Sequence, residues 1–519
     1  MKHLTLLLAL LLLPTCQSHP STAEPRTQPN LVLILVDDLG WQDTSVAFTK
    51  VPTAFQQRYR TPNLERLAAA GVRFSDAYAS GSVCTPTRSA LMSGQAPSRT
   101  HITDWTLHKE RDFSRPMAPL ADPAWHKAGL APSSDLLPEL LRQQGYRTIF
   151  IGKAHFGARD TPGADPLNLG FDVNIAGHAA GAPGSYYAKE SFGTLKDNPW
   201  GVPGLDHYHG QDLFLTEALT LEMERELEIA AEDGRPFFLD FSHYAVHTPI
   251  QADPRFAPAY LAQGLDAKEA AYASLIEGVD ANLGRLLAKL EALDLAEDTL
   301  ILFTSDNGGL SAHGRGKTPS GSGKDSHNAP LRSGKGSGYE GGLRVPFVLA
   351  WAGDVLGHPK SALREGAAQS LALEAGRLDS TPTITTDLYV TFALLGGVPH
   401  ERVAATHPEG IDLAPLLRGE SVHPPRFLAW NYPHKWGPEG DRYEPFVALR
   451  QGDWKIIHWY QDHSWELYNL ASDLGEQVNR MQKDPEVAAE MQELLRSWML
   501  EVQAQRPIDQ TTGVMLPMP

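Results

Sequence analysis

The sequence predicts an α/β protein in which helices sandwich a large, mostly parallel sheet, followed by a smaller antiparallel sheet with one helix. Residues 31–36 form a continuous apolar run between polar residues, which is typical of a central parallel strand. Similar runs alternate with helical patterns over most of the chain, and this alternation indicates a parallel sheet covered by helices. Beyond residue 420 short strand-like runs follow one another, which predicts a separate antiparallel sheet.

In the larger domain, apolar patterns and the residues that end them mark the elements. Pro62 lies in the first turn of a predicted helix, Gly71 follows its end, and Gly145 closes the next helix. Residues 158–210 are rich in Gly, Pro and aromatic residues without periodicity, so we expect loops that line a site. The expected strands are residues 31–36, 147–151, 237–241, 299–303 and 347–351, and the expected helices are residues 61–70, 136–144, 213–232 and 268–293.

The C-terminal region has its own pattern. Its predicted strands are residues 427–432, 446–450, 454–460 and 465–469, and its predicted helix is residues 485–502. The sequence therefore predicts an export segment (residues 1–23), a main domain (residues 29–420) and a C-terminal α+β subdomain (residues 421–519).

The composition is that of a globular protein with an acidic balance. Of the 519 residues, 42% are hydrophobic and 21% are charged, and the formal net charge is −17. Because no basic stripe stands out, these numbers exclude a nucleic-acid partner. An anionic ligand would need positive charge concentrated locally, by a metal ion or by a few Lys and Arg side chains.

The N-terminus predicts export. The apolar run of residues 4–13 follows Lys2 and is too short to span a bilayer, as in a secretory signal. The segment Leu13-Pro14-Thr15-Cys16 is similar to a bacterial lipobox, in which the cysteine carries a lipid anchor. Lipidation at Cys16 and ordinary cleavage near residues 18–23 both stay open. Either route predicts a protein in the periplasm, anchored at the outer membrane, or secreted.

Polar side chains follow four of the predicted strands at the point where each strand ends. Since ligands bind at the carboxyl edge of open α/β sheets, we expect these side chains to meet there. Each pattern alone also fits an ordinary turn or helix cap, whereas their convergence indicates a site. The clusters are Asp37 with Asp38, Lys153 with His155, His247, and Asp306 with Asn307.

The chemistry of these side chains indicates a divalent cation beside an anionic substrate. Asp37, Asp38, Asp306 and Asn307 offer hard oxygen ligands, which suit Ca²⁺ or Mg²⁺ rather than zinc. The remaining basic groups can neutralise an anionic ester and move protons, and these are Lys153, His155, His247 and Lys335.

Cys84 is the only cysteine outside the export segment, so no disulfide framework is expected. It begins the stretch Cys84-Thr-Pro-Thr-Arg88, which continues Ser-Ala-Leu-Met-Ser-Gly94. Pro86 is expected to hold Thr85 extended, which would place Cys84 just before a helix N-terminus, where negative charge is favoured. A buried structural cysteine would fit this position as well.

The Cys84 stretch resembles the signature of the type I, formylglycine-dependent sulfatases of the alkaline-phosphatase-like superfamily, in their bacterial exported branch. The resemblance extends from residue 29 to about residue 479. One departure is Ala154, where the family often has an aromatic residue, and it concerns packing or substrate fit. The other matching segments are residues 30–40, 152–157, 247–249, 304–309, 334–346, 452–455 and 466–470.

This resemblance implies a mechanism. A maturation enzyme would oxidise Cys84 to formylglycine, whose hydrate also binds the metal ion; one hydroxyl, with Arg88 and His155 nearby, would attack the sulfate. His247 and Lys335 would protonate the departing alcohol, while Lys153 and Lys335 hold sulfate oxygens. His155 would then act as the base when sulfate leaves.

The substrate is expected to be a sulfated glycan, with a sulfated galactose or N-acetylgalactosamine unit as the specific expectation. Family specificity lies in loops, which here are residues 100–124, 177–186 and 430–436. Trp105, His178 and His434 are the predicted contacts with the sugar. Trp430 and Trp436 fit either a sugar contact or packing between domains.

Two other functions stay open at the level of sequence. A phosphomonoester or phosphonate hydrolase of the same fold would share the metal carboxylates, and the intact Cys84 motif favours sulfate. An inactive sulfoglycan-binding protein would have lost catalytic residues, whereas Cys84, Arg88, His247 and Lys335 are all present. A purely structural exported protein does not explain the charged clusters.

Overall fold

The structure is a computed structural model that describes residues 28–49, 52–194, 198–316, 326–358, 371–420, 426–437 and 441–519. The export segment with Cys16 lies outside the described residues, so export and lipid anchoring stay predictions. Among the described helices, none is long and apolar enough to cross a membrane.

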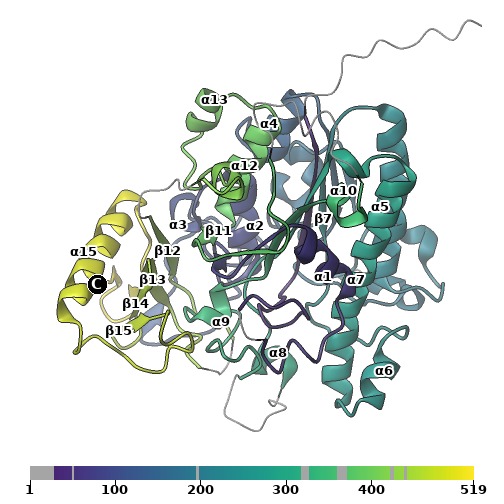
Figure 1. The fold of residues 1–519 in the computed structure, drawn as a ribbon. Coiled ribbons are helices and arrows are strands. Elements are labelled where there is room, and N and C mark those ends of the chain that lie inside the picture. The colour runs from purple at the N-terminus through teal and green to yellow at the C-terminus, as the bar shows by residue number, and fades with distance from the viewer. Residues whose placement is uncertain are drawn as a thin grey trace, which may run out of the picture.

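An eight-stranded sheet forms the centre of the larger part of the molecule, and it confirms the predicted fold class (Figure 1). All of its pairings are parallel except those of β9, which runs antiparallel to β8 and β2. In spatial order the strands are β10 (Arg377–Asp379), β2 (Val72–Phe74), β9 (Phe347–Trp351), β8 (Thr299–Ser305), β1 (Asn30–Val36), β7 (Phe237–Ser242), β5 (Arg147–Gly152) and β6 (Val173–Ile175).

Strand β1 shows how the sheet is buried on both faces. Val32, Ile34 and Val36 belong to one hydrophobic cluster, while the alternate residues Leu31, Leu33 and Leu35 belong to another. The first cluster includes side chains of α1 (Pro62–Ala70), α5 (Leu215–Asp233), α6 (Ala257–Ala262) and α7 (Ala267–Ala292). The second includes those of α2 (Cys84–Ser93), α4 (Leu137–Gln143), α12 (Thr386–Leu395), α13 (His400–Ala404) and α14 (Ala414–Leu417).

The long elements lie within a few residues of their predicted bounds, whereas several short ones were not expected. Every residue of α12 is buried, so it lacks the polar face that marks a surface helix. Strands of two or three residues are too short to show periodicity. The other short elements are β3 (Ala77–Tyr78), β11 (Thr383–Ile384), α3 (Pro97–Thr100), α8 (Ala312–Arg315), α9 (Glu340–Leu343), α10 (Ala352–Leu356), and the 3₁₀ turns η1 (Pro162–Ala164), η2 (Pro166–Leu169), η3 (Ala188–Gly193), η5 (Asp206–Tyr208) and η6 (Ala296–Asp298).

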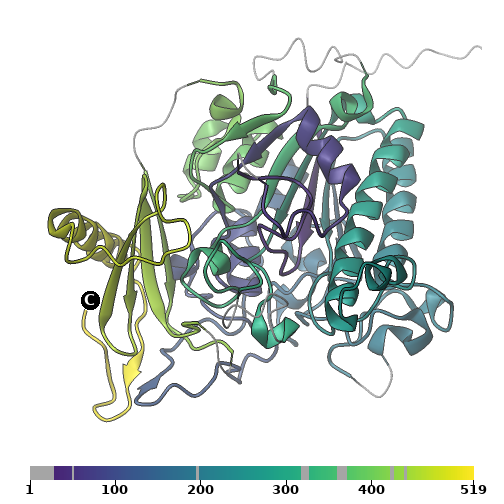
Figure 2. The same ribbon diagram turned by 60° about the horizontal axis from the view of Figure 1, so that its bottom comes forward.

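A four-stranded antiparallel sheet follows near the C-terminus, with helix α15 (Pro485–Glu501) on its outer face (Figure 2). Val447 and Leu449 pack with the helix, while Ala448, between them, belongs to a cluster with Tyr339 of the larger part. One face of the sheet therefore packs against helix α15, and the other face packs against the larger part of the molecule. Its strands are β12 (Phe427–Tyr432), β13 (Phe446–Gln451), β14 (Trp454–Trp459) and β15 (Ser464–Asn469).

The C-terminal tail returns to a loop of the larger part. Strand β16 (Ile508–Asp509) pairs with β17 (Val514–Met515) and also with β4 (Leu120–Ala121). Met117 and Leu120 of this loop pack in the same hydrophobic cluster as α15. The sequence did not predict this small sheet. Through the pairing of β16 with β4, the C-terminal tail holds the loop of residues 100–124 in place.

Candidate functional site

The parallel register brings the predicted polar clusters to one edge of the sheet. Strand β1 lies between β7 and β8, and β5 follows β7, so the carboxyl ends of these four strands are neighbours. Asp37 and Asp38 follow β1, while Asp306 and Asn307 follow β8. Lys153 follows β5, and the chain after β7 carries His247.

Three carboxylates and Cys84 converge at this edge. Ligand atoms of Asp37, Asp38, Cys84 and Asp306 all lie within 4.8 Å of one another. The backbone N–H of Asp38 donates to Asp306 Oδ1 at 3.2 Å, and Asn307 Nδ2 donates to Asp38 Oδ1 at 2.9 Å. Asp38 Oδ2 and Asn307 Oδ1 are buried and accept no hydrogen bond from the described residues. A group of oxygens that lacks donors in this way fits a hard divalent cation.

Each carboxylate of this group has a basic side chain in close contact. Lys153 Nζ lies 2.6 Å from Asp37 Oδ2, and Arg88 Nε lies 2.8 Å from Asp306 Oδ2. Both basic side chains are buried. Burial, together with the nearby carboxylates, raises the pKa of Asp37 despite the opposing charge of Lys153. Crowded carboxylates of this kind are stabilised when a cation binds between them.

Lys335 is the third basic partner and also contacts the cysteine. Its Nζ lies 2.5 Å from Asp38 Oδ1 and 3.3 Å from Cys84 Sγ. Against the effect of burial, this lysine and His247 lower the pKa of Asp38. The loop that carries Lys335 therefore reaches the end of β1 from a distant part of the chain.

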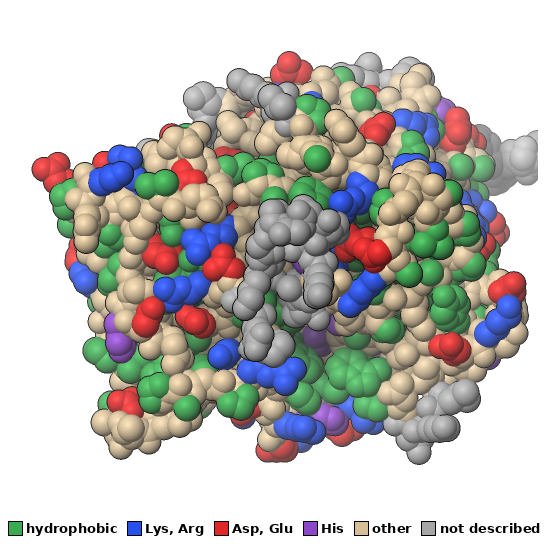
Figure 3. All heavy atoms as spheres, turned by 90° about the horizontal axis from the view of Figure 1, so that it is seen from below, with side chains coloured by type: hydrophobic (Ala, Val, Ile, Leu, Met, Phe, Trp, Pro, Cys, Tyr) green, Lys and Arg blue, Asp and Glu red, His purple; other side chains and the backbone are tan. Residues whose placement is uncertain are grey.

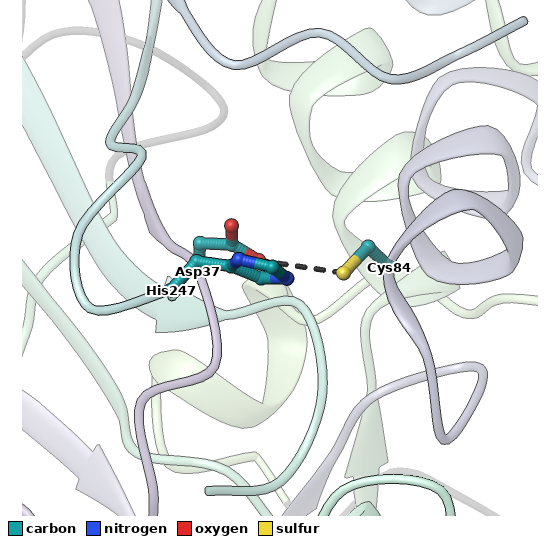
Figure 4. Close-up of side chains that lie close together, drawn as sticks. All are labelled: Asp37, Cys84 and His247. Carbon is teal, nitrogen blue, oxygen red and sulfur yellow. Dashed lines mark hydrogen bonds between the residues drawn. The ribbon is translucent and has the colours of Figure 1, made fainter. Parts of the chain in front are cut away.

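Cys84 is the first residue of helix α2 and points toward the carboxylates (Figure 4). Its Sγ donates to Asp37 Oδ1 at 3.4 Å. Thr85 and Pro86 lie within the first turn of the helix, which corrects the expectation of an extended Thr85 and a later helix start. Proline is tolerated there because its missing N–H would have no partner within the helix.

Two histidines of the site are held by carbonyl groups. His247 Nδ1 donates to Thr248 O at 2.8 Å, which leaves Nε2 free, 3.6 Å from Asp38 Oδ2. His155 Nε2 donates to Thr106 O at 2.8 Å, and its Nδ1 is buried without a partner among the described residues. Burial and then Lys335 lower the pKa of His247 to about 3, and burial and then Lys153 lower that of His155. Both rings are therefore neutral proton acceptors.

A cavity of about 710 Å³ opens above these groups. Its size is that of pockets that enclose whole small ligands. The rings of Trp105 and Phe113 contact each other in its wall, tilted by 32° with centroids 4.5 Å apart, and the ring centroid of Trp200 lies 6.4 Å from that of Trp105. The lining residues are Val83, Cys84, Trp105, Phe113, Arg115, His155, Gly181, Ala182, Pro183, Gly184, Asn198, Trp200, His247, Thr248, Pro249, Lys335, Trp436 and Gly437.

Of the predicted sugar contacts, Trp105 lines the cavity, whereas His178 and His434 do not. His178 is partly buried, and its carbonyl accepts a hydrogen bond from the N–H of His155. His434 is buried between Thr103 and Asp122 and contacts both.

The tryptophans and Ala154 fall into two groups. Trp436 lines the cavity, and its ring centroid lies 5.4 Å from Lys335 Nζ. Trp430, in β12, is buried in the hydrophobic cluster between the C-terminal sheet and the larger part, and it donates to Ala79 O. Ala154 lies in the hydrophobic core, so the departure at this position concerns packing.

Several wall residues were not singled out by the sequence. Phe113 and Arg115 belong to the predicted specificity loop of residues 100–124, whose length and aromatic content were the available signal. Asn198 and Trp200 come from the region expected to form lining loops. Nothing in their local pattern marks them as wall residues.

Comparisons with known proteins agree with this geometry. A family model described as Sulfatase matches residues 29–384. A sulfatase of Formosa agariphila is 28% identical over 555 residues, which cover 95% of this chain and 93% of that protein. The N-acetylgalactosamine-6-sulfatase of Mus musculus is 28% identical, covering 86% of this chain and 75% of that protein. The crystal structure of Ps i-CgsB in complex with k-i-k-neocarrahexaose aligns with a TM-score of 0.69 and 26% identity, covering 94% of this chain and 95% of that chain.

The matched region contains all eight strands of the large sheet, and it includes Asp37, Cys84, His247 and Lys335. The family model spans well over half of the chain. This chain belongs to the sulfatase family of the alkaline-phosphatase-like superfamily, and it is a sulfatase.

Proposed function

We propose that this sulfatase hydrolyses sulfate esters of a sulfated carbohydrate, with oxidised Cys84 as the nucleophile and a bound divalent metal ion. One observation carries the proposal. Cys84 Sγ lies at the base of the cavity, 3.4 Å from Asp37 Oδ1 and 3.3 Å from Lys335 Nζ. The atom attached to this Cβ therefore faces both a cation-binding carboxylate group and a basic side chain.

The unmodified thiol is a poor nucleophile in this place. Burial, followed by the charge of Asp37, raises the pKa of the Cys84 thiol well above its ordinary value, so the reactive thiolate is disfavoured. Oxidation by a maturation enzyme would replace sulfur with an aldehyde. Its hydrate carries two hydroxyl groups on one carbon, so one can take up sulfate and the other can release it.

The oxygen ligands fit Ca²⁺, with Mg²⁺ as the alternative. Asp37, Asp38, Asp306 and Asn307 would hold the ion together with the oxidised residue at position 84. The ion would supply positive charge that favours an ionised hydroxyl and polarises a sulfate oxygen.

The protein's own side chains are placed for the remaining roles. Lys153 and Lys335 are buried cations beside the reacting position and can hold sulfate oxygens. His247 and Lys335 line the cavity, where the departing alcohol must lie, so we assign them the proton transfer to its oxygen. His155 has a buried Nδ1 without a partner among the described residues, and it can accept the proton when sulfate leaves.

The substrate proposal is a sulfated galactose or N-acetylgalactosamine unit of a glycan. Trp105, Phe113 and Trp200 form an aromatic wall of tilted rings, and their apolar faces suit a sugar ring. The names of two similar proteins are consistent with this class, since one is an N-acetylgalactosamine-6-sulfatase and the other binds k-i-k-neocarrahexaose.

The test combines peptide mass analysis with sulfate release. Protein produced with a maturation enzyme should have lost the sulfur at position 84 and should release sulfate from a sulfated galactose or N-acetylgalactosamine. Cys84→Ser should fold and turn over at most once per site, because a single hydroxyl can form the ester but cannot expel it. Full activity with an intact thiol at position 84 would disprove the oxidised nucleophile.

The same assay separates sulfate from phosphate chemistry. Nitrophenyl sulfate and nitrophenyl phosphate share a leaving group, so their kcat/KM values compare the two anions directly. We expect the sulfate to be the better substrate. A higher kcat/KM for the phosphate would favour the phosphomonoesterase alternative instead.

A further inference from the structure

The outer wall of the cavity carries one exposed basic residue, Arg115, whose side chain has no role in the chemistry proposed above. The residue lines the cavity, and its guanidinium makes no hydrogen bond or ion pair with any described residue. Lys335, the other Lys or Arg side chain among the described lining residues, is already paired with Asp38 and contacts Cys84. Arg115 is thus the lining cation that remains available to a ligand.

Hydrogen bonds and a strand pairing hold the loop around Arg115 in place. The N–H of Arg115 donates to Lys435 O at 2.8 Å, and Ser114 Oγ donates to Asp122, which in turn contacts His434. Further along, Leu120 lies in strand β4, which pairs with β16 of the C-terminal tail. The backbone is therefore held in place while the guanidinium has no partner among the residues that the structure describes, as expected for a side chain that serves a ligand.

The charges of the described lining residues also favour an anionic ligand. None of its described lining residues is Asp or Glu, although the whole chain has 62 acidic residues and a net charge of −17. Acidic and basic side chains are otherwise interspersed on the surface, as seen from below in Figure 3. Among the described lining residues, Arg115 is the exposed side chain that carries a formal positive charge.

The position of Arg115 distinguishes it from the groups that bind the reacting sulfate. It follows Phe113 by two residues, and the ring of Phe113 contacts that of Trp105 in the aromatic wall. Lys153 and Lys335, which are proposed to hold the reacting sulfate, are buried, whereas Arg115 is exposed. A sugar lying against the aromatic wall would bring its outer substituents, rather than its reacting sulfate, to this guanidinium.

We infer that the carbohydrate substrate carries a second oxyanion, a sulfate or a carboxylate, and that Arg115 binds it. The inference rests on the proposed carbohydrate sulfatase function of the same cavity. A guanidinium donates two parallel hydrogen bonds to either oxyanion, because a sulfate and a carboxylate both present two anionic oxygens side by side. Arg115 is accordingly a specificity-determining residue.

The experiment compares one disaccharide in three forms: with a single sulfate, with two sulfates, and with one sulfate and one carboxylate. For the wild-type enzyme we expect KM to be about tenfold lower when a second oxyanion is present. The doubly sulfated and carboxylated forms identify which oxyanion is preferred. The preference should shrink as NaCl is raised, because Arg115 is exposed to solvent.

Arg115→Gln should bring the ratio of the KM values for singly and doubly charged disaccharides close to one, and Arg115→Lys should restore part of it. A general disturbance of the fold would change both KM values together and leave the ratio intact. The matched control is Lys109→Gln, which removes one exposed positive charge from the same loop outside the cavity lining. This control should keep the wild-type ratio.

Two results would overturn the inference: equal KM values for the singly and doubly charged disaccharides in the wild type, or an Arg115→Gln variant with the wild-type ratio. Failure of the proposed function would look different. In that case none of the three disaccharides would release sulfate at any concentration, while nitrophenyl sulfate could still be cleaved.

Discussion

Lys335 Nζ donates a hydrogen bond to Cys84 Sγ at 3.3 Å, although the two residues are 251 positions apart in the chain. The same Nζ lies 2.5 Å from Asp38 Oδ1. One basic side chain therefore contacts both the reacting position and a carboxylate of the metal-binding group. Removing it should disturb anion binding and the departure of the alcohol together.

Lys335→Ala is expected to lower kcat and raise KM, with kcat/KM falling by roughly 10²–10⁴-fold. The loss should be larger on a sugar sulfate than on nitrophenyl sulfate, because the nitrophenolate needs little protonation. Steady-state kinetics on both substrates give the comparison. Equal losses would limit Lys335 to anion binding, and unchanged kinetics would remove it from the site.

Divalent cations should stabilise the protein through the oxygens of Asp37, Asp38, Asp306 and Asn307. After chelation the melting temperature should fall, and Ca²⁺ should restore it. Asn307→Leu keeps the size of the side chain but removes the buried amide oxygen, so the apparent Ca²⁺ affinity should fall about tenfold.

The control for this experiment is Gln263→Ala, which deletes an exposed amide far along the chain from the carboxylate group. Its calcium titration, followed by thermal melting, should match that of the wild type. If neither the chelator nor Ca²⁺ changes the melting temperature of the wild type, the metal site is ruled out. In a crystal grown with calcium, the ligand oxygens should lie about 2.3–2.6 Å from the ion.

Lys455 connects the C-terminal sheet to the segment that carries Lys335. Its Nζ lies 2.8 Å from Glu340 Oε1 and 2.9 Å from Glu476 Oε1, and all three side chains are buried. Lys455→Met would leave both carboxylates without this partner, so the free energy of unfolding should fall by about 3–5 kcal/mol. Urea denaturation measures the loss.

The matched control is Lys189→Met, since Lys189 forms an exposed ion pair with Asp212. Exposed pairs contribute little, and this variant should unfold almost like the wild type. Because Glu340 begins α9, five residues after Lys335, we also expect Lys455→Met to lower kcat. Two variants of equal stability would show that the buried ion pairs do not hold the two sheets together.

Asp104 should make stability depend on pH. Burial raises the pKa of its carboxyl to about 6, and its Oδ2 accepts no hydrogen bond from the described residues. Since the folded pKa lies above the unfolded value, the folded state binds the proton more tightly. Stability is therefore lost as the pH rises from about 4 to about 6, by about 3 kcal/mol in total.

Asp104→Asn lacks this titration. The free energy of unfolding of the variant, relative to the wild type, should rise by about 3 kcal/mol between pH 4 and pH 7. Urea denaturation at the two pH values gives the difference, with Asp206→Asn, at an exposed position, as control. A constant difference between variant and wild type would show that Asp104 does not titrate in this range.

The parts of the fold that were predicted share a local cause. Strands β1, β7 and β8 are buried on both faces, so their sequences are continuous apolar runs that need no partner to be recognised. Strands β4, β16 and β17 have two residues each, and β4 pairs with β16 only because the C-terminal tail meets a distant loop. Their pairing depends on tertiary contacts that leave no periodic pattern.

The sequence alone determined which residues could carry the chemistry. Parallel strands end at a common edge, so Asp37 and Asp306 were expected at the same edge, and the pairing of β1 with β8 then made them neighbours. The motif of residues 84–94 indicated the family before any geometry was known. Tertiary structure decided the shape of the cavity. It placed Arg115 in the cavity lining and left His178 and His434 out of it, because loop positions follow from packing against distant segments, which local sequence does not record.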